Sequence, residues 1–497
     1  MKVKFTRRRI LFFLLVIFLI LFGRPIVFLS YNYLKDSNTT QSTKPGYAND
    51  ASRMNQTKID SIIQVASATI EAETQLIDLV RKANAEGKKI SIAGSQHSMG
   101  GHTIYPDGIV LSMKNFNQMK LDTIKNLLVV GAGATWAEVI PYLDQFGRSV
   151  AVMQSNNSFS VGGSISVNCH GWQPNTGPIA STVESFRILT AEGTIKTCSK
   201  TENAELFSLA LGGYGLFGII LEVTLRVTSN KAYRMHQYVF SSKDYIQKFE
   251  ELANNKNTGM AYGRLSISPN NFLNEAILGI CTIDTNETVP QLEPAGYAGL
   301  RRTVFRSSAN SNYGKKLRWR LEKLTARLNR GKLFSRNQLI NEPVDIYQNN
   351  KEGYTDILHE YFIPKDSVVR FIEELRKTIP NYKVDLLNIT LRNVMKDEDV
   401  FLKYASTEVF GFVMLYNQQT TKEADQEMQR CTQKLIDIAI ALKGTYYLPY
   451  RLHATKDQLI KAYPNITDFF RLKITYDPQE VFQNEFYRTY NKHIINK

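Results

Sequence analysis

The stretch Ile90-Ser91-Ile92-Ala93-Gly94-Ser95-Gln96-His97-Ser98-Met99-Gly100-Gly101 places a histidine in a loop of small residues that follows a short β-type run. Small residues allow a backbone to approach a phosphate closely, and consecutive N–H groups in such a loop bind an anion. The pattern therefore predicts an anion-binding loop in which His97 is held against the molecule that carries the phosphate.

Two more glycine-rich stretches follow, Val161-Gly162-Gly163-Ser164 and Gly212-Gly213-Tyr214-Gly215-Leu216-Phe217-Gly218. Three such loops within roughly 130 residues predict an extended cofactor that contains a pyrophosphate. A Rossmann dinucleotide turn is the alternative, because Gly131-Ala132-Gly133 also follows a β-type run. That fingerprint requires a third glycine where this chain has Trp136, so we reject it.

The order of these motifs resembles that of the FAD-linked oxidoreductases of the vanillyl-alcohol oxidase, or PCMH, type. Alditol and aldonolactone oxidases, cytokinin dehydrogenases and decaprenylphosphoryl-ribose oxidase belong to this family. The resemblance is strong over residues 60–227 and returns at 473–490. It implies an α+β fold, with a PCMH-type two-part FAD-binding domain and an α+β substrate (cap) domain. We expect the FAD-binding domain over 58–230, the cap over 231–440 and a return to the FAD-binding domain over 441–497.

Hydrophobic periodicity adds expected elements. Helices are predicted over 71–85, 137–146, 243–253, 366–378 and 421–442, and strands over 237–240, 264–267, 359–364, 384–393 and 410–416. The change to alternating strands and helices after Tyr233 supports a separate cap domain.

The resemblance also implies which residues bind FAD. A Gly-x-x-His-Ser loop holds the pyrophosphate in this family, and its histidine is often bonded covalently to the flavin, which here would occur through His97. No cysteine lies between Ala151 and Ser160, where doubly linked relatives carry one, so no second bond is expected. The cofactor-binding residues implied in this way are Ala93, Gly94, Ser95, Gln96, His97, Ser98, Met99, Val161, Gly162, Gly163, Ser164, His170, Gly171, Gly218, Ile219 and Ile220.

Six polar residues lie, by the same resemblance, on segments that face the flavin: Arg264, Glu360, Asn388, Arg392, Tyr450 and Arg451. Oxidation of an alcohol by a flavin requires a group that takes the hydroxyl proton. Glu360 or Tyr450 could take it, and Arg264 and Arg392 could stabilise an anion. The alternatives are that Glu360 pairs with a strand arginine and that Tyr450 packs at the rim of the site.

The net charge of +15 is concentrated in two regions. Residues 1–9 carry five basic residues, and residues 301–340 carry twelve Lys or Arg against Glu322 alone. The rest of the chain is close to neutral, which argues against a nucleic-acid partner. The four cysteines and seven histidines show neither Cys-x-x-Cys nor paired-ligand spacing, so we expect no metal.

The N-terminus resembles a membrane anchor. Ile10–Phe22 is wholly apolar, and Ile26–Leu29 resume the run after Gly23, Arg24 and Pro25, giving a span of about 20 residues that just reaches the hydrocarbon thickness of a bilayer. The preceding basic residues favour a cytoplasmic N-terminus and a catalytic body on the outer or periplasmic side. A cleaved signal peptide and a twin-arginine export signal are alternatives. Residues 1–35 are thus expected to be the anchor and 36–57 a linker.

The second basic region contains Leu317, Leu321, Leu324 and Leu328 at helical spacing. This pattern predicts an amphipathic helix with a basic surface. The basic surface of this helix would contact either a membrane or an anionic substrate. Alternatively, the helix would cover the cap domain and turn its basic face to solvent.

These features together predict a membrane-anchored FAD-dependent oxidoreductase that oxidises a small alcohol-type substrate, such as a sugar, polyol or lactone, with O₂ or a quinone as acceptor. A membrane-bound sterol-reductase-like enzyme is one alternative, although His97 argues against it. A flavin-bearing relay subunit without a substrate of its own is another. The absence of the His-Trp-x-Lys motif of sugar oxidases weakens a simple aldonolactone assignment.

Overall fold

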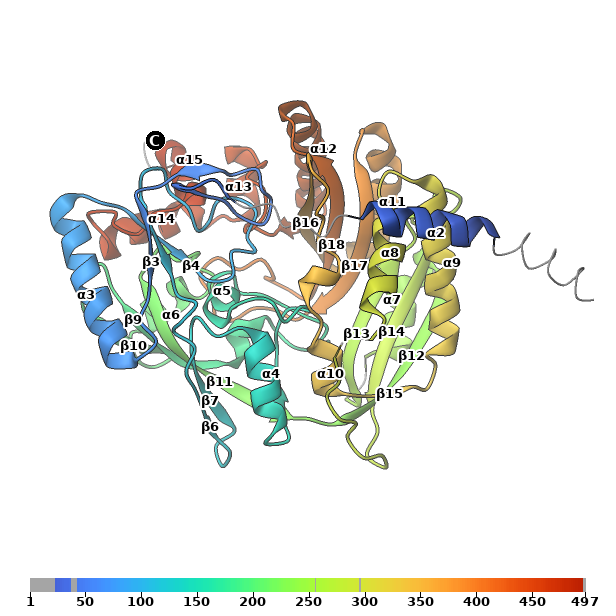
Figure 1. Cartoon of the computed structure of the whole chain (residues 1–497), viewed down its shortest axis with the longest axis horizontal. Helices are drawn as coiled ribbons and strands as arrows, with labels where there is room; N and C mark the ends of the chain where they lie inside the picture. Colours follow the sequence, from blue (N-terminus) through green and yellow to red (C-terminus); the bar gives the residue numbers. More distant parts are fainter. Residues whose placement is uncertain (1–22, 37–42, 255, 295, 495–497) are drawn as a thin grey trace, which may run out of the picture.

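The computed structural model describes residues 23–36 and 43–494, except for positions 255 and 295. Two α/β lobes lie side by side, with the N-terminal half of the chain and its last helices in one and the middle of the chain in the other (Figure 1). One continuous hydrophobic core runs through both lobes.

The first sheet of the N-terminal lobe is a small parallel one. It contains β3 (Ser61–Gln64), β4 (Ile90–Ala93) and β5 (Ile109–Ser112) in the order β3-β5-β4. Helix α3 (Thr69–Glu86) joins β3 to β4 and buries Ala72, Leu76 and Val80, which recur every four residues on one helical face. It ends at Gly87, whose φ of +68° suits a glycine. β4 therefore leads directly into the loop that begins at Gly94.

The second sheet of this lobe has six antiparallel strands in the order β10-β9-β11-β7-β6, with β8 paired to β11. Its strands are β6 (Met119–Asp122), β7 (Leu127–Gly131), β8 (Arg148–Val150), β9 (Val183–Leu189), β10 (Ile195–Ser199) and β11 (Ile219–Ser229). Its helices are α4 (Trp136–Asp144), α5 (Val161–Ser166) and α6 (Ala204–Ala210). The 161–164 glycine stretch thus forms the first turn of α5, capped by the Ser160 hydroxyl.

The middle lobe is an eight-stranded sheet in the order β15-β12-β14-β13-β17-β18-β16-β19, with antiparallel pairs throughout. Its strands are β12 (Ala232–Ser241), β13 (Thr258–Leu265), β14 (Glu275–Ile283), β15 (Leu333–Ser335), β16 (Tyr354–Pro364), β17 (Asp385–Val394), β18 (Val409–Gln419) and β19 (Thr445–Tyr446). Its helices are α7 (Tyr245–Leu252), α8 (Ala298–Arg306), α9 (Asn312–Leu328), α10 (Arg336–Ile340), α11 (Val368–Thr378) and α12 (Lys422–Ala441).

The two faces of this sheet differ in chemistry, because side chains alternate along each strand. Phe410 and Phe412 of β18 pack against Phe249 of α7 and Phe371 of α11. Glu360 of β16 lies on the opposite, cavity-facing side. One face is thus a hydrophobic interface with helices, and the other supplies polar groups to the cavity.

The chain returns to the first lobe after β19 through α13 (Lys456–Ala462), α14 (Ile466–Tyr476) and α15 (Glu485–Ile494). The Ile90 N–H donates to Val481 O at 2.7 Å, and the Gln483 N–H donates to Ile90 O at 2.9 Å. Tyr446 still pairs with Tyr361 of β16 in the cap sheet. The return of the chain to the first lobe, expected from residue 441, therefore begins after Tyr446.

The N-terminal segments differ from expectation. Much of the predicted linker is packed: β1 (Tyr47–Ala48) pairs with β2 (Thr57–Lys58), and Asp50 between them is buried. Ile26–Leu29 lie in α2 (Arg24–Lys35), whose Phe28 contacts Tyr313 of α9 edge-on. The apolar run 10–22 lies outside the described residues. Within the described part, no helix has both the length and the apolar character needed to cross a bilayer.

The leucine stripe of α9 is not the buried face that its spacing suggested. Leu324 and Leu328 are exposed, whereas Gly314, Arg318, Trp319 and Ala326 are buried. Arg318 is buried because the Glu322 carboxylate and the Leu387 carbonyl accept its hydrogen bonds. The physical reason for the difference is that buried charges are tolerated when paired, so the inner face of a helix need not be its most apolar one.

Candidate active site

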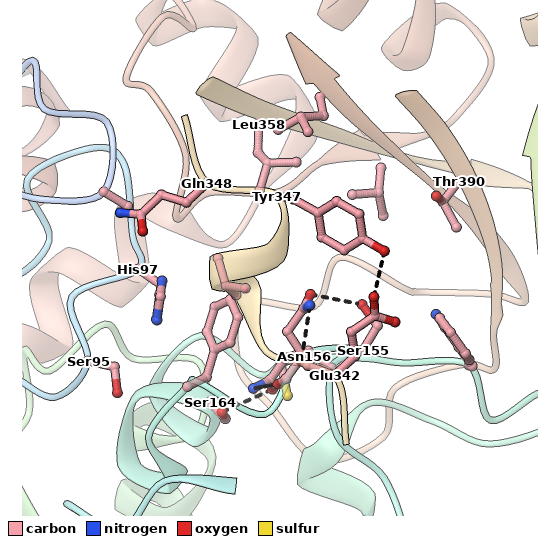
Figure 2. A pocket seen from close by; sticks show the side chains of 18 of the residues that line it. Ser95, His97, Ser155, Asn156, Ser164, Glu342, Tyr347, Gln348, Leu358 and Thr390 are labelled. Carbon is pink, nitrogen blue, oxygen red and sulfur yellow. Dashed lines mark hydrogen bonds between the residues drawn. The ribbon is translucent and has the colours of Figure 1, made fainter. Parts of the chain in front are cut away.

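A cavity of about 1710 Å³ lies where the loops of the N-terminal lobe meet the polar face of the cap sheet. Figure 2 shows residues from both lobes around it, including Ser95, His97 and Ser164 on one side and Leu358 and Thr390 on the other. Cavities for drug-sized ligands measure about 300–1,000 Å³. This cavity therefore has room for a dinucleotide and a second small molecule.

Two glycine-rich loops meet at Ser160. Its Oγ accepts hydrogen bonds from the N–H groups of Ser95 at 3.4 Å and Gly163 at 3.3 Å. A Cβ added to Gly94 would lie 2.0 Å from the same oxygen and 3.0 Å from the Ser160 Cβ, so any other residue would force Ser160 to move. Gln96 has a φ of +55°, and a left-handed residue in a tight turn can direct successive N–H groups toward an anion. The geometry suits a pyrophosphate.

The predicted linker supplies a clamp that the sequence did not reveal. The Asp50 carboxylate accepts hydrogen bonds from the Gly101 N–H at 2.8 Å and the Asn55 side chain at 2.6 Å. Asn55 also donates to Met99 O. Burial raises the pKa of Asp50. This segment fixes the far end of the 94–101 loop, but its polar composition is indistinguishable from that of a free linker.

Most of the predicted cofactor-binding residues line the cavity. They are Gly94, Ser95, Gln96, His97, Ser98, Met99, Gly162, Gly163, Ser164, His170, Gly218 and Ile220. Ala93, Val161, Gly171 and Ile219 do not line it. These four are buried behind the surface of the cavity, and Ile219 illustrates the reason, since it alternates along the chain with Gly218 and Ile220 and points to the other face.

His97 lies on the wall of the cavity next to Phe159, with ring centroids 4.2 Å apart. Its Nε2 is 3.2 Å from the Ser158 carbonyl oxygen. The ring is thus held from two sides by the segment that leads into α5, while its backbone belongs to the phosphate loop.

Glu360 is the polar centre of the cap face. Its Oε1 lies 2.6 Å from Nε2 of His170, and its Oε2 accepts a hydrogen bond of 3.5 Å from the Tyr450 hydroxyl. Glu360 and His170 are each 3% exposed. Among the described residues no arginine forms an ion pair with Glu360, so the carboxylate is positioned by a histidine and a tyrosine instead.

Tyr450 lines the cavity but is poorly suited to be the base. Burial, together with the adjacent Glu360 carboxylate, raises the pKa of Tyr450 well above its ordinary value. The phenol therefore stays protonated at neutral pH and donates a hydrogen bond. This favours Glu360 over Tyr450 as the proton acceptor.

Arg392 of β17 supplies positive charge to the cavity. Its Nη2 donates to Ser155 Oγ at 2.9 Å and its Nη1 to the His170 carbonyl at 3.4 Å, while its buried Nε has no hydrogen-bond partner. No carboxylate within the described chain forms an ion pair with Arg392. A guanidinium in this state can bind an anionic oxygen of a substrate or stabilise a reduced, anionic flavin.

The other two candidate arginines differ from each other. Arg264 lines the cavity, but its Nη2 is paired with Glu322 at 2.8 Å. Burial alone would raise the pKa of Glu322, but the charges of Arg264 and Arg318 hold that pKa below its usual value. Arg451 does not line the cavity. It pairs with Asp425 at 2.8 Å, so the structure does not bring it together with the other candidate residues at the cavity.

An outer arm of the cavity contains residues that sequence reasoning missed. The Tyr347 hydroxyl and Arg301 both bond to the Glu342 carboxylate, and Asn156 bonds to the Glu342 carbonyl at 3.3 Å (Figure 2). Asn388, considered earlier, also lines the cavity, and Arg318 bonds to its side-chain oxygen. Arg301, Glu342 and Tyr347 come from the segment between β14 and β16, whereas Asn156 precedes α5 and Asn388 lies on β17.

These features define the class of protein. Glycine loops converge on one side of the cavity, His97 lies within one of them, and Arg392 opposite has no ion-pair partner within the described chain; this arrangement is suited to FAD with a substrate at its exposed face. The fold and the site are those of a PCMH-type FAD-linked oxidoreductase.

Comparison with known families agrees. An FAD binding domain model matches residues 66–199, and a D-arabinono-1,4-lactone oxidase model matches residues 223–490, which is more than half of the chain. The chain belongs to the D-arabinono-1,4-lactone oxidase family.

The chain matches its curated relatives over about a third of their length. L-gulonolactone oxidase from Bos taurus is 32% identical over 159 residues, covering 32% of this chain and 35% of the relative. A putative D-arabinono-1,4-lactone oxidase from Neurospora crassa is 28% identical, covering 36% of this chain and 33% of the relative. Cytokinin dehydrogenase 2 from Arabidopsis thaliana is 29% identical, covering 37% and 38%.

Proposed function

We propose that this protein is an FAD-dependent oxidase or dehydrogenase that oxidises a CH–OH group of a sugar lactone or a closely related polyol. The observation that best supports this proposal is the position of the Glu360 carboxylate, which lies between His170 and Tyr450 on the cavity face opposite the phosphate loops. The family match and the names of the relatives, L-gulonolactone oxidase and D-arabinono-1,4-lactone oxidase, support this substrate class.

The residues of this chain would act as follows. The 94–99 and 162–164 loops would hold FAD, which would supply the hydride acceptor. Glu360 takes the proton of the substrate hydroxyl, and the Tyr450 hydroxyl stabilises the carboxylate before that transfer. Arg392 binds the oxygen on which negative charge develops. The outer arm around Glu342 and Tyr347 offers hydrogen bonds to the remaining hydroxyl groups of the substrate.

An anaerobic titration tests this proposal. Purified protein is mixed without oxygen with L-gulono-1,4-lactone, D-arabinono-1,4-lactone and glucose, and the flavin absorbance is followed. Bleaching by a lactone is expected. A flavin that none of the sugars reduces would instead favour the alternative of a relay subunit without its own substrate. Reoxidation by air compared with a soluble quinone would then identify the electron acceptor.

We also propose that His97 is bonded covalently to the flavin. His97→Ala should release FAD on acid precipitation while the folded protein still binds it, because the backbone N–H groups of the loop remain. The absorbance of the acid pellet and supernatant measures this. If the unaltered protein also releases all of its flavin into the supernatant, the covalent bond does not exist.

Tyr450→Phe is expected to slow flavin reduction less than a substitution of Glu360. The 3.5 Å hydrogen bond to Glu360 is long, and losing it should slow flavin reduction about tenfold, equivalent to about 1.4 kcal/mol. Stopped-flow reduction at saturating lactone measures this rate. A loss as large as that of a Glu360 variant would mean that the phenol itself handles the proton.

Finally, we propose that the N-terminal segment attaches the protein to a membrane. The support is the apolar run 10–22, preceded by five basic residues. A single-pass orientation, with the N-terminus cytoplasmic and the catalytic body outside, stays a prediction. Protease protection of the body in sealed vesicles would test it.

A further inference from the structure

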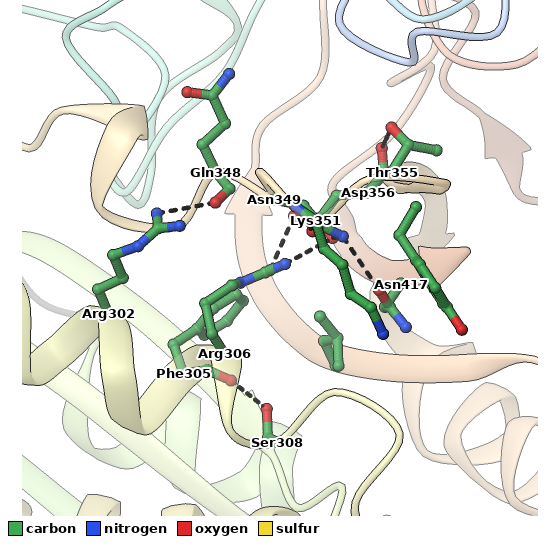
Figure 3. Close-up of polar contacts among 12 residues, drawn as sticks. Arg302, Phe305, Arg306, Ser308, Gln348, Asn349, Lys351, Thr355, Asp356 and Asn417 are labelled. Carbon is green, nitrogen blue, oxygen red and sulfur yellow. Dashed lines mark hydrogen bonds and ion pairs between the residues drawn. The ribbon is translucent and has the colours of Figure 1, made fainter. Parts of the chain in front are cut away.

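Eleven of the twelve cations of the basic region 301–340 divide into two groups of different character, and the twelfth, Arg336, is buried and donates to the Val150 and Ala151 carbonyls. Six of its twelve cations form ion pairs with acidic side chains: Arg301, Arg302, Arg306, Lys315, Arg318 and Lys323. Figure 3 shows part of this group, where Arg306 reaches Asp356 and Arg302 reaches the Gln348 carbonyl. Four of these pairs join α8 or α9 to other parts of the cap, Arg302 pairs with Asp36 after α2, and Arg318 pairs with Glu322 within α9, so the charge of all six is used within the protein.

The second group faces outward. Lys316, Arg320, Arg327, Arg330 and Lys332 have no acidic partner within the described chain, and all except the half-buried Lys316 are exposed. On α9, residues 316, 320, 324, 327 and 328 lie on one helical face, because they follow steps of three and four. Cations and the exposed Leu324 and Leu328 therefore alternate on the same surface.

Apolar exposure is concentrated in the same part of the molecule. Sixteen large hydrophobic side chains are exposed in the described chain, and nine of them belong to α2, α8 with its preceding residue, and α9. They are Ile26, Val27, Tyr31, Tyr33, Leu34, Tyr297, Leu300, Leu324 and Leu328. Figure 1 shows α2 lying across α8 and α9 at the outer side of the cap. We call this surface the α2–α8–α9 face.

Two further observations indicate what this face meets. The described chain begins at Gly23, directly before α2, so the apolar run 10–22 joins the molecule at this face. The cavity also reaches it, because Tyr297 and Leu300 are 86% and 58% exposed and line the cavity together with Leu321 of α9. The cavity thus has an apolar rim on the side where the N-terminal segment emerges.

We infer that the α2–α8–α9 face docks on the surface of an anionic lipid bilayer, with Leu324, Leu328 and the side chains of α2 at the level of the head groups. Amphipathic helices that carry Lys and Arg beside apolar side chains bind such surfaces in this way. Docking would point the rim formed by Tyr297 and Leu300 toward the membrane. This inference rests on the proposed membrane attachment and deepens it by naming the face that meets the lipid.

Site-specific fluorescence on the full-length protein tests the inference. All four native cysteines are buried, so a polarity-sensitive dye can be placed at Leu324→Cys without labelling them. Ile70→Cys on α3 is the matched control, since Ile70 is 84% exposed and α3 lies on the opposite side of the molecule (Figure 1). The proteins are reconstituted in phosphatidylcholine vesicles with phosphatidylglycerol, and lipids carrying a nitroxide near the head group are the quencher.

Quenching of about half or more of the dye emission is expected at Leu324→Cys and little at Ile70→Cys, because docked side chains lie about 5–10 Å into the head-group region. Arg320→Glu with Arg327→Glu, or vesicles of phosphatidylcholine alone, should lower that quenching while lactone-driven flavin bleaching is unchanged. Equal quenching at both positions, or none at Leu324→Cys, would overturn the inference. The inference would also be overturned if the dye at Leu324→Cys were quenched in detergent without lipid, and more strongly at higher protein concentration. That result would mean that the face binds a second copy of the chain.

Discussion

Glu360→Gln should lower kcat/KM for the lactone about 10²–10⁴-fold, the range typical for loss of a positioned proton acceptor. The amide keeps the shape of the side chain and can still hydrogen-bond to His170 and Tyr450, so the cavity should retain its form. What it loses is the ability to take a proton. The rate of anaerobic flavin reduction should therefore fall, while the ratio of bound flavin to protein stays the same.

Glu342→Gln is the matched control for this experiment. Glu342 also lines the cavity, but its carboxylate pairs with Arg301 and Tyr347 rather than with His170. We expect a change in KM with a change in kcat of less than about threefold, as for a residue that contributes only to substrate binding. Equal losses in the two variants would remove the special role of Glu360 and leave His170 as the next base to test.

The parts of the site that local sequence dictates could be predicted. Glycine at 94 is required because a Cβ would collide with Ser160, and glycine at 218 because its φ is +144° and a Cβ would lie 2.5 Å from Leu189 O. Because these positions require glycine, the sequence itself shows a pattern of small residues there. Strands β16 and β18 were predictable for a similar reason, since alternation along them separates the helix-covered face from the cavity face.

The parts that depend on distant contacts could not be predicted. The segment around Asp50 has the composition of a linker, and only its bonds to Gly101 and Asn55 show that it is structural. Arg451 was assigned to the site with Tyr450, but Asp425, which lies 26 positions earlier, holds it elsewhere. On helix α9 the paired Arg318 is buried while Leu324 and Leu328 are exposed. In each case a partner far along the chain decides the side chain's position.

Gly163→Val should give a folded protein that purifies without flavin. A Cβ at Gly163 has only one neighbour within 4 Å, the Ser160 Oγ at 2.9 Å, and that hydroxyl can rotate. Valine is tolerated in a helix, and α5 has ordinary helical geometry here. The added methyl groups would instead occupy the cavity where the two glycine loops approach the cofactor. Flavin absorbance per protein should fall to near zero, while circular dichroism stays unchanged.

Gly162→Val, one residue earlier, separates loss of cofactor from loss of fold. A Cβ at Gly162 would lie 2.7 Å from the Cβ of Ala132 and 2.9 Å from its carbonyl oxygen, and this backbone cannot move aside without disturbing β7. Overpacking of this kind costs about 1–3 kcal/mol, so this variant should unfold at lower denaturant concentration. If Gly163→Val instead bound flavin normally, the loop would not touch the pyrophosphate. If the two variants lost stability equally, Gly163 would have a structural role, and its position on the cavity wall would be incidental.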